Sequence, residues 1–168
     1  MAKWWKSVFL SFFLIGIVAV LSTHYFINRP IVYYYVEAAD SYDGIRPLDV
    51  KLKFKNAGQS YVAAVLVLSV KNATIVPPPP APYISCTESE LRIEYGLEGG
   101  GKDYAVYDVA VSPKKGAKTF ALSYVVEKAF ELTQSGAVGC IFGEIHPYYP
   151  TSLTYNMTSE GIYIKVEG

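Results

Sequence analysis

Three residues near the C-terminus follow the order of the ligands in a copper site: Cys140, His146 and Met157. A blue-copper centre holds its metal with one cysteine, two histidines and a weak methionine, and the second histidine comes from an earlier strand. The only other histidine, His24, lies in an apolar run near the N-terminus. The ligand set for copper is therefore incomplete, and we expect this chain to bind no cofactor.

Two further motifs that could do chemistry are also incomplete. Gly96–Lys102 has the spacing of a phosphate-binding loop, but Asp103 stands where a magnesium-binding hydroxyl belongs. A strand is predicted next, so no helix N-terminus is present to hold a phosphate, and we expect a flexible loop. A Ser/His/Asp nucleophile is not predicted, because His146 is the only histidine of the domain and no serine has a recognisable elbow.

Cys86 and Cys140 are the only cysteines. An even number of cysteines in an exported domain predicts a disulfide. A bridge between them closes a loop of about 54 residues and stabilises the fold by a few kcal/mol in the chain-entropy model. Two separate buried thiols, or a reactive or metal-binding cysteine, remain as alternatives.

Two tripeptides match the acceptor sequence for N-glycosylation, with no proline in the middle. They are Asn72-Ala73-Thr74 and Asn156-Met157-Thr158. Asn72 and Asn156 are therefore candidate glycosylation sites, and they agree with export of the domain.

The first 29 residues decide where the domain works. Val8–Ile27 carries no acidic or basic side chain. Its length as a helix is roughly 30 Å, which is enough to cross a membrane. Trp4, Trp5 and Tyr25 lie where interfacial aromatic residues belong. We expect an anchor with a span at about residues 8–27; a signal peptide cleaved at Val20-Leu21-Ser22 is the alternative.

Basic residues predict the orientation of the chain. Lys3, Lys6 and the N-terminal amine outweigh Arg29, so the positive-inside rule places the N-terminus in the cytoplasm. Residues 1–29 are then a single-pass anchor in the cell membrane, in contact with lipid, and residues 30–168 form an exported domain.

The charge balance excludes one class of partner. The chain has 15 basic and 15 acidic residues, and three of the basic ones lie in the anchor. The exported domain therefore has more acidic than basic groups and no basic cluster, so nucleic-acid binding is not expected. With 51% apolar residues, the chain has enough for the core of one domain.

Short β-type segments separated by turns run through the domain. Leu48–Phe54 alternates apolar and polar residues as a half-buried strand does, and Tyr61–Val70 is apolar enough for a central strand covered on both faces. Tyr104–Val111 and Phe120–Val126 predict a hairpin around Ser112–Gly116. The remaining predicted strands are Ile31–Val36, Leu91–Tyr95, Val138–Ile145 and Ile162–Val166.

Two connecting segments have other predictions. Pro77–Pro82 is expected to be a stiff extended connector. Val126–Gln134 could be a short helix instead of a strand. Many short strands with turn signals predict an all-β domain, an antiparallel immunoglobulin-like sandwich of about 7–9 strands behind one N-terminal transmembrane helix.

Tyrosines are grouped at two places, Tyr33, Tyr34 and Tyr35 in one strand and Tyr148 and Tyr149 near the C-terminus. They could form a contact patch. Consecutive residues of a strand point to opposite faces, so part of each group is expected in the core.

The overall plan resembles the small subunit of archaeal thiosulfate:quinone oxidoreductase. The shared features are an N-terminal anchor, a tyrosine-rich exported β domain, sequons, and the stretch Tyr104–Leu122 with its Pro113–Gly116 turn. Leu48–Thr74 also resembles the strand–Asn-x-Gly–strand pattern of extracellular archaeal immunoglobulin-like modules, a pattern that indicates little about function.

The first resemblance implies a hetero-oligomeric complex with a larger multi-helix membrane subunit. Such a complex oxidises thiosulfate to tetrathionate outside the cell and passes the electrons to a membrane quinone. This chain would form the outward-facing substrate surface, with Cys86 or Cys140 as a sulfur-handling thiol, or with basic side chains holding the dianion.

The competing class is non-enzymatic. An anchored surface, pilus or adhesion protein would assemble through pairing of edge strands. An accessory oxidase subunit without copper is a further alternative.

Overall fold

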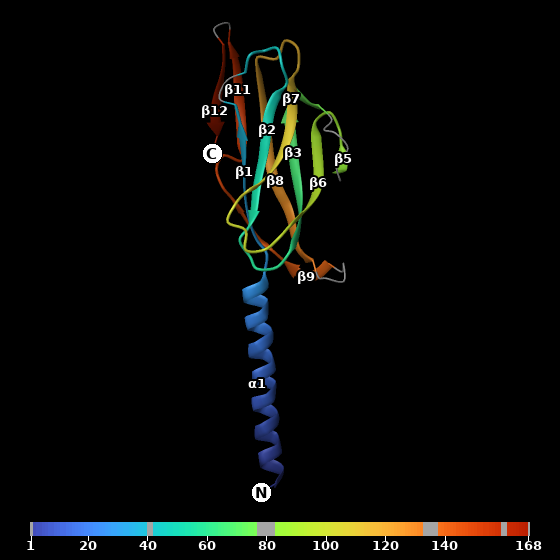
Figure 1. The fold of residues 1–168 in the computed structure, drawn as a ribbon, viewed down its shortest axis with the longest axis vertical. Coiled ribbons are helices and arrows are strands. Elements are labelled where there is room, and N and C mark those ends of the chain that lie inside the picture. The colour runs from blue at the N-terminus through green and yellow to red at the C-terminus, as the bar shows by residue number, and fades with distance from the viewer. Residues whose placement is uncertain (1, 40–41, 77–82, 133–137, 159–160, 168) are drawn as a thin grey trace.

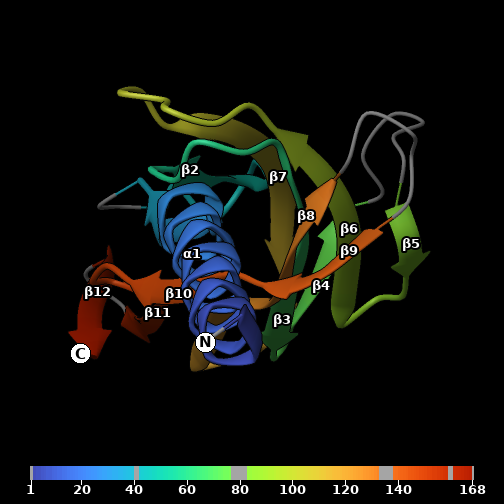
Figure 2. The same cartoon turned by 90° about the horizontal axis from the view of Figure 1, so that it is seen from below.

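The computed structural model describes residues 2–39, 42–76, 83–132, 138–158 and 161–167. One helix, α1 (Ala2–Asn28), is followed by two β-sheets that enclose a single core. The helix leaves one end of the sandwich along the long axis of the molecule (Figure 1), and Figure 2 views the sandwich from that end. The predicted fold class, an antiparallel sandwich behind an N-terminal helix, is confirmed.

The smaller sheet has five strands. Their order across the sheet is β10 (Glu144–Pro147), β1 (Ile31–Ala38), β2 (Leu48–Asn56), β7 (Ala105–Pro113) and β4 (Ala73–Val76). The neighbours are antiparallel, except that β10 runs parallel to β1. Because β1 starts next to α1, β10 also starts at the end of the sandwich that the helix enters.

The larger sheet has seven strands. Their order is β12 (Gly161–Glu167), β11 (Ser152–Thr158), β8 (Thr119–Leu132), β3 (Val62–Lys71), β6 (Glu90–Leu97) and β5 (Tyr83–Cys86), and β9 (Val138–Phe142) pairs with β8. β3 is central, and it is buried on both faces over most of its length. This confirms the prediction made from its continuous apolar run.

The core consists of the inward-facing residues of both sheets. Leu48, Val50, Leu52 and Phe54 of β2 are all buried, as their alternation predicts. Phe120, Leu122, Tyr124 and Val126 form the buried face of β8. Aromatic rings join the two sheets, with Tyr34 of β1 and Tyr124 of β8 at 5.3 Å between ring centroids.

The predicted hairpin is wrong. β7 pairs with β2 and β4, whereas β8 pairs with β3, β9 and β11, so the two strands lie in different sheets. The chain crosses between the sheets at Lys114–Lys118. A hairpin and a crossover between sheets give the same sequence pattern: two strands of alternating apolar and polar residues with a turn between them. The pattern is the same because each strand buries one face in both arrangements. The short helix that we considered for Val126–Gln134 is also wrong as far as Leu132, where β8 ends.

The predicted strand Val138–Ile145 is two strands, since the chain leaves one sheet at Gly143 and enters the other. A Cβ at Gly143 would lie 2.9 Å from the Cβ of Pro30 and 3.0 Å from that of Ala129, so a larger residue does not fit there. Strands β4, β5 and β11 were not predicted, and they bring the described part of the chain to twelve strands. The proline connector at 77–82 lies outside the described residues.

Candidate functional site

The junction between helix and sandwich is two residues long, Arg29 and Pro30. The Arg29 guanidinium pairs with the Glu144 carboxylate of β10 at 2.6 Å and lies over the Phe26 ring at 5.6 Å. The backbone N–H of Glu144 donates to the Pro30 carbonyl at 2.8 Å. The end of α1 is thereby bonded to a strand more than a hundred residues later in the sequence.

Asn56 holds the start of β1, directly after the junction, against the turn between β2 and β3. It is 1% exposed and is the one buried polar residue among those described. Its Oδ1 accepts from the backbone N–H groups of Ile31 at 3.3 Å and Gly58 at 3.0 Å, and its Nδ2 donates to the Ser60 carbonyl at 2.6 Å. A Cβ on Gly58 would collide with the Arg29 carbonyl, so only glycine lets the turn approach this closely.

The glycine-rich loop between β6 and β7 packs on the same turn. The N–H of Gly100 donates to the Gly58 carbonyl at 2.6 Å, and the N–H of Gly101 donates to the Asn56 carbonyl at 3.2 Å. β7 follows this loop, as predicted, but the loop is hydrogen-bonded rather than free. The start of β1 is therefore held by the Asn56 turn, which the glycine-rich loop supports, while the helix end itself is bonded to β10.

The outer face of β10, β1 and β2 carries a cluster that we call the tyrosine–lysine face. In strand register, Tyr33 lies between His146 and Lys55, and Tyr35 is paired with Lys53. Its members come from β1, β2, β10 and the segments next to β7 and β10: Tyr33, Tyr35, Lys53, Lys55, Tyr104, His146 and Tyr148.

The rings of this face contact one another. The Tyr33 ring stacks on the His146 ring at 5.2 Å and meets the Tyr148 ring edge-on at 6.3 Å. The Tyr35 and Tyr104 rings are 5.0 Å apart, also edge-on. Such pairs contribute about 0.5–1.5 kcal/mol each beyond the area they bury. Partial burial, and then the other tyrosines of the face, raises the pKa of Tyr104.

The two lysines of the face have different partners. Lys53 forms an ion pair with Glu37, and this hydrogen bond lowers the pKa of Glu37 and raises that of Lys53. The Lys55 ammonium lies 5.6 Å from the Tyr33 ring centroid and 4.8 Å from that of Tyr104. No carboxylate pairs with Lys55 in the described part of the chain.

The five grouped tyrosines divide between core and surface as the strand period requires. Tyr34 is buried, whereas Tyr33 and Tyr35 are half-buried on the outer face. Tyr148 and Tyr149 are 58% and 69% exposed. The sequence therefore named Tyr33, Tyr35 and Tyr148 as possible contact residues, but it predicted neither Tyr104 nor the lysines as members of this face.

The structure does not bring the two cysteine-bearing strands together. Cys86 has a free, half-buried thiol on β5, while Cys140 belongs to β9, whose side chains lie outside those described. β6, β3 and β8 separate these strands in the sheet. Strands are about 4.8 Å apart and a disulfide joins Cα atoms within about 7 Å, so the strand order does not favour the bridge. The disulfide remains a prediction.

The two sequons do come together, at the end of the sandwich far from α1. Asn72 is exposed, has a φ of 56°, and donates from Nδ2 to the Thr119 carbonyl at 3.1 Å. Asn156 of β11 is the register partner of the same Thr119. Both candidate acceptors therefore lie away from the junction and from the tyrosine–lysine face.

The incomplete copper motif is divided between the sheets. His146 lies on β10 with its Nε2 3.3 Å from a Glu144 carboxylate oxygen, and Met157 lies on β11 of the other sheet. Among the described residues, no three His, Cys, Asp or Glu side chains gather as a metal site would require.

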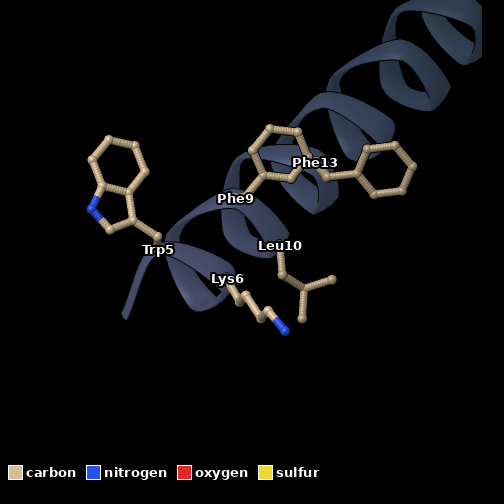
Figure 3. Close-up of a pocket in the computed structure, with 5 residues that line it drawn as sticks. All are labelled: Trp5, Lys6, Phe9, Leu10 and Phe13. Atoms are coloured by element: carbon tan, nitrogen blue, oxygen red, sulfur yellow. The ribbon is translucent and has the colours of Figure 1, made fainter. Parts of the chain in front are cut away.

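The described residues also form hollows outside the tyrosine–lysine face. Two are grooves on α1, the larger of about 510 Å³; Figure 3 shows the side chains that line it projecting from the helix: Trp5, Lys6, Phe9, Leu10 and Phe13. A third hollow of about 320 Å³ lies beside the loop that joins β1 and β2. The grooves are open, because no other described helix or strand packs on α1: Trp4–Ile27 is 0% buried in its most apolar window.

No family model matches the chain, and no curated protein is significantly similar to it in sequence. Two solved structures with a similar architecture are cohesin modules. A type III module of the cell-surface anchoring scaffoldin ScaE of Ruminococcus flavefaciens covers 71% of this chain with 88% of its own length, at 9% identity and a TM-score of 0.40. A module of a Clostridium perfringens family 33 glycoside hydrolase covers 72% with 99% of its length, at 10% identity and a TM-score of 0.36. This likeness is too slight to support a conclusion about function.

Proposed function

We propose that this chain is a membrane-anchored extracytoplasmic subunit of a hetero-oligomeric membrane complex. In this proposal α1 spans the bilayer, and the sandwich stands on its outer surface beside a larger multi-helix subunit. The observation that carries the proposal is the short junction, in which Arg29 and Pro30 both contact Glu144 of β10. A simple tether needs only a flexible linker, whereas this junction is two residues long and both residues contact Glu144 of the sandwich.

The helix itself supports the placement in a membrane. Trp4–Ile27 is long and apolar enough to cross a bilayer, and its large side chains are exposed along its length. Lys3 and Lys6 lie at the N-terminal end of the helix and Arg29 follows its C-terminal end, which favours an external sandwich. The sequons at the far end of the sandwich then face the compartment in which glycans are attached.

In this proposal the multi-helix partner subunit carries out the reaction of the complex. A quinone-linked oxidation of thiosulfate, the activity implied by the resemblance to the small subunit of thiosulfate:quinone oxidoreductase, is the specific form of this proposal. A membrane quinone would accept the electrons in the multi-helix subunit, and this chain would shape the external surface of the complex.

Purification from native membranes in a mild detergent tests the proposal. We expect the chain to resist extraction by alkaline carbonate, to co-purify with a polytopic subunit in a fixed ratio, and to accompany thiosulfate-dependent quinone reduction. A complex without this activity would retain the anchored subunit and reject thiosulfate oxidation. Filaments or a lone monomer would overturn the proposal and favour a surface, pilus or adhesion protein.

A further inference from the structure

We infer that the tyrosine–lysine face docks an acidic extracytoplasmic segment of the membrane partner, and that Lys55 receives a carboxylate from that segment. The inference rests on the proposed function, because it names the chemistry by which the partner is recognised. It adds a surface, a charge and a residue that can each be tested separately from the reaction of the complex.

Charge complementarity points to a carboxylate. Around the face, Lys53 is paired with Glu37, and Glu144 is paired with Arg29. Lys55, by contrast, forms no ion pair with a carboxylate among the described residues. Its ammonium lies over two tyrosine rings. A cation–π contact fixes such a group in position and leaves its hydrogen-bond donors for an external acceptor.

The aromatic part of the face is suited to a protein partner. Tyrosine supplies a large contact area with few rotatable bonds and keeps a polar hydroxyl, which is why it is enriched at interfaces. Here Tyr33, Tyr35 and Tyr104 are already positioned by ring contacts. Less side-chain freedom is lost when a partner binds rings that are already held.

The direction of the face distinguishes a protein from the bilayer. β1 and β2 run along the long axis that α1 continues, so their outer face stands beside that axis rather than across its end (Figure 1). A membrane around α1 lies across the end of the sandwich, at Arg29 and the turns near Gly58 and Gly100. A neighbouring subunit that rises above the membrane can cover the whole face, and the Arg29–Glu144 contact makes this face continuous with the anchor.

Carbodiimide cross-linking of the native complex tests the inference, since this reagent joins an amine to a carboxylate only when they are in contact. We expect a cross-linked peptide in which Lys55 is joined to Asp or Glu of a polytopic membrane protein. Lys55→Arg keeps the charge but removes the reactive amine, so it should retain the complex and lose the cross-link. Lys55→Glu should lose both, with recovery of the partner reduced by at least about tenfold, the change that 1.4 kcal/mol produces.

Lys115→Glu is the matched control, because Lys115 is exposed in the β7–β8 turn at the far end of the sandwich. It should retain the partner and the Lys55 cross-link. Lys115→Glu and Lys55→Arg should keep the wild-type melting temperature, whereas Lys55→Glu loses two cation–π contacts and should stay folded but melt a few degrees lower. Full recovery of the partner with Lys55→Glu overturns the inference and leaves the proposed function intact. Binding to vesicles of anionic phospholipid that is lost in Lys55→Glu, with the protein complex retained, also overturns it, in favour of a lipid-facing surface. A wild-type chain that purifies alone overturns the proposed function itself.

Discussion

Replacement of Asn56 by alanine is the sharpest test of how the start of β1, directly after the junction, is held against the turn between β2 and β3. The substitution removes three hydrogen bonds, to the N–H groups of Ile31 and Gly58 and to the Ser60 carbonyl. At about 1 kcal/mol for each bond, we expect Asn56→Ala to lower the free energy of unfolding by about 3 kcal/mol. In a domain of this size, that loss corresponds to a melting temperature lower by about 10 °C.

Asn56→Asp distinguishes the contribution of the accepting Oδ1 atom from that of the donating Nδ2 group. It keeps an acceptor for Ile31 and Gly58 but places a carboxylate oxygen against the Ser60 carbonyl, 2.6 Å from the present Nδ2 position. Burial and this carbonyl raise the pKa of the introduced acid in the folded state. Its destabilisation should therefore grow as the pH rises above the unfolded value of about 3.9, and it should be relieved at lower pH.

The assay is thermal unfolding of the full chain in detergent, followed by near-UV circular dichroism. Gln59→Ala is the control, because Gln59 is an exposed side chain of the same turn, and its effect should stay within about 0.5 kcal/mol. Hydrogen exchange at the amide of Gly58 should accelerate in Asn56→Ala. A melting temperature for Asn56→Ala equal to that of the control would refute this account of the junction.

Three further predictions concern other parts of the sandwich. Tyr124→Phe should leave stability unchanged or raise it by up to about 1 kcal/mol in a thermal melt, because the buried Tyr124 hydroxyl has no hydrogen-bond partner among the described residues. Lys53 lowers the pKa of Glu37, so their pair stabilises the fold above the unfolded carboxyl value, and this contribution is lost as the pH falls through the lowered folded value. The loss, less than about 1 kcal/mol for a partly exposed pair, should be absent in Glu37→Gln. Mass spectrometry of the native protein should find a glycan on Asn72, and Thr74→Val should remove it while Thr74→Ser keeps it; an unmodified Asn72 peptide in the wild type would contradict this.

The sequence predicts a strand well where the pattern of apolar residues depends only on which faces of that strand are buried. The alternation in Leu48–Phe54 and the continuous apolar run of Tyr61–Val70 follow directly from burial on one face or on two. Burial does not specify which strands pair. The crossover at Lys114–Lys118 therefore has the same pattern as a hairpin, and only pairing of β7 with β2 and of β8 with β3 separates the two.

The candidate site shows the same limit. An Asn-x-Gly turn at Asn56 is visible in the sequence, but its burial arises because the turn meets the start of β1 and the glycine-rich loop. Lys55 has the pattern of a solvent-facing strand residue. Its place over Tyr33 and Tyr104 depends on pairing with β1 on one side and on the approach of the segment before β7 on the other. Contacts between distant segments are not encoded in local periodicity.

The position of the two sequons leaves the tyrosine–lysine face accessible to a partner. Asn72 and Asn156 both lie near Thr119, at the opposite end of the sandwich from α1. Glycans there would leave the tyrosine–lysine face and the junction uncovered. The face that we assign to the partner is thus free of candidate modification sites.

Native mass spectrometry of the protein extracted from its own membranes would show directly whether the chain belongs to a membrane complex. We expect a complex of fixed stoichiometry that contains this chain, with α1 retained, together with a larger polytopic subunit. Release of that subunit by Lys55→Glu, but not by Lys115→Glu, would connect the complex to the tyrosine–lysine face. A chain that lacks α1, or that is recovered only as a monomer, would contradict the account.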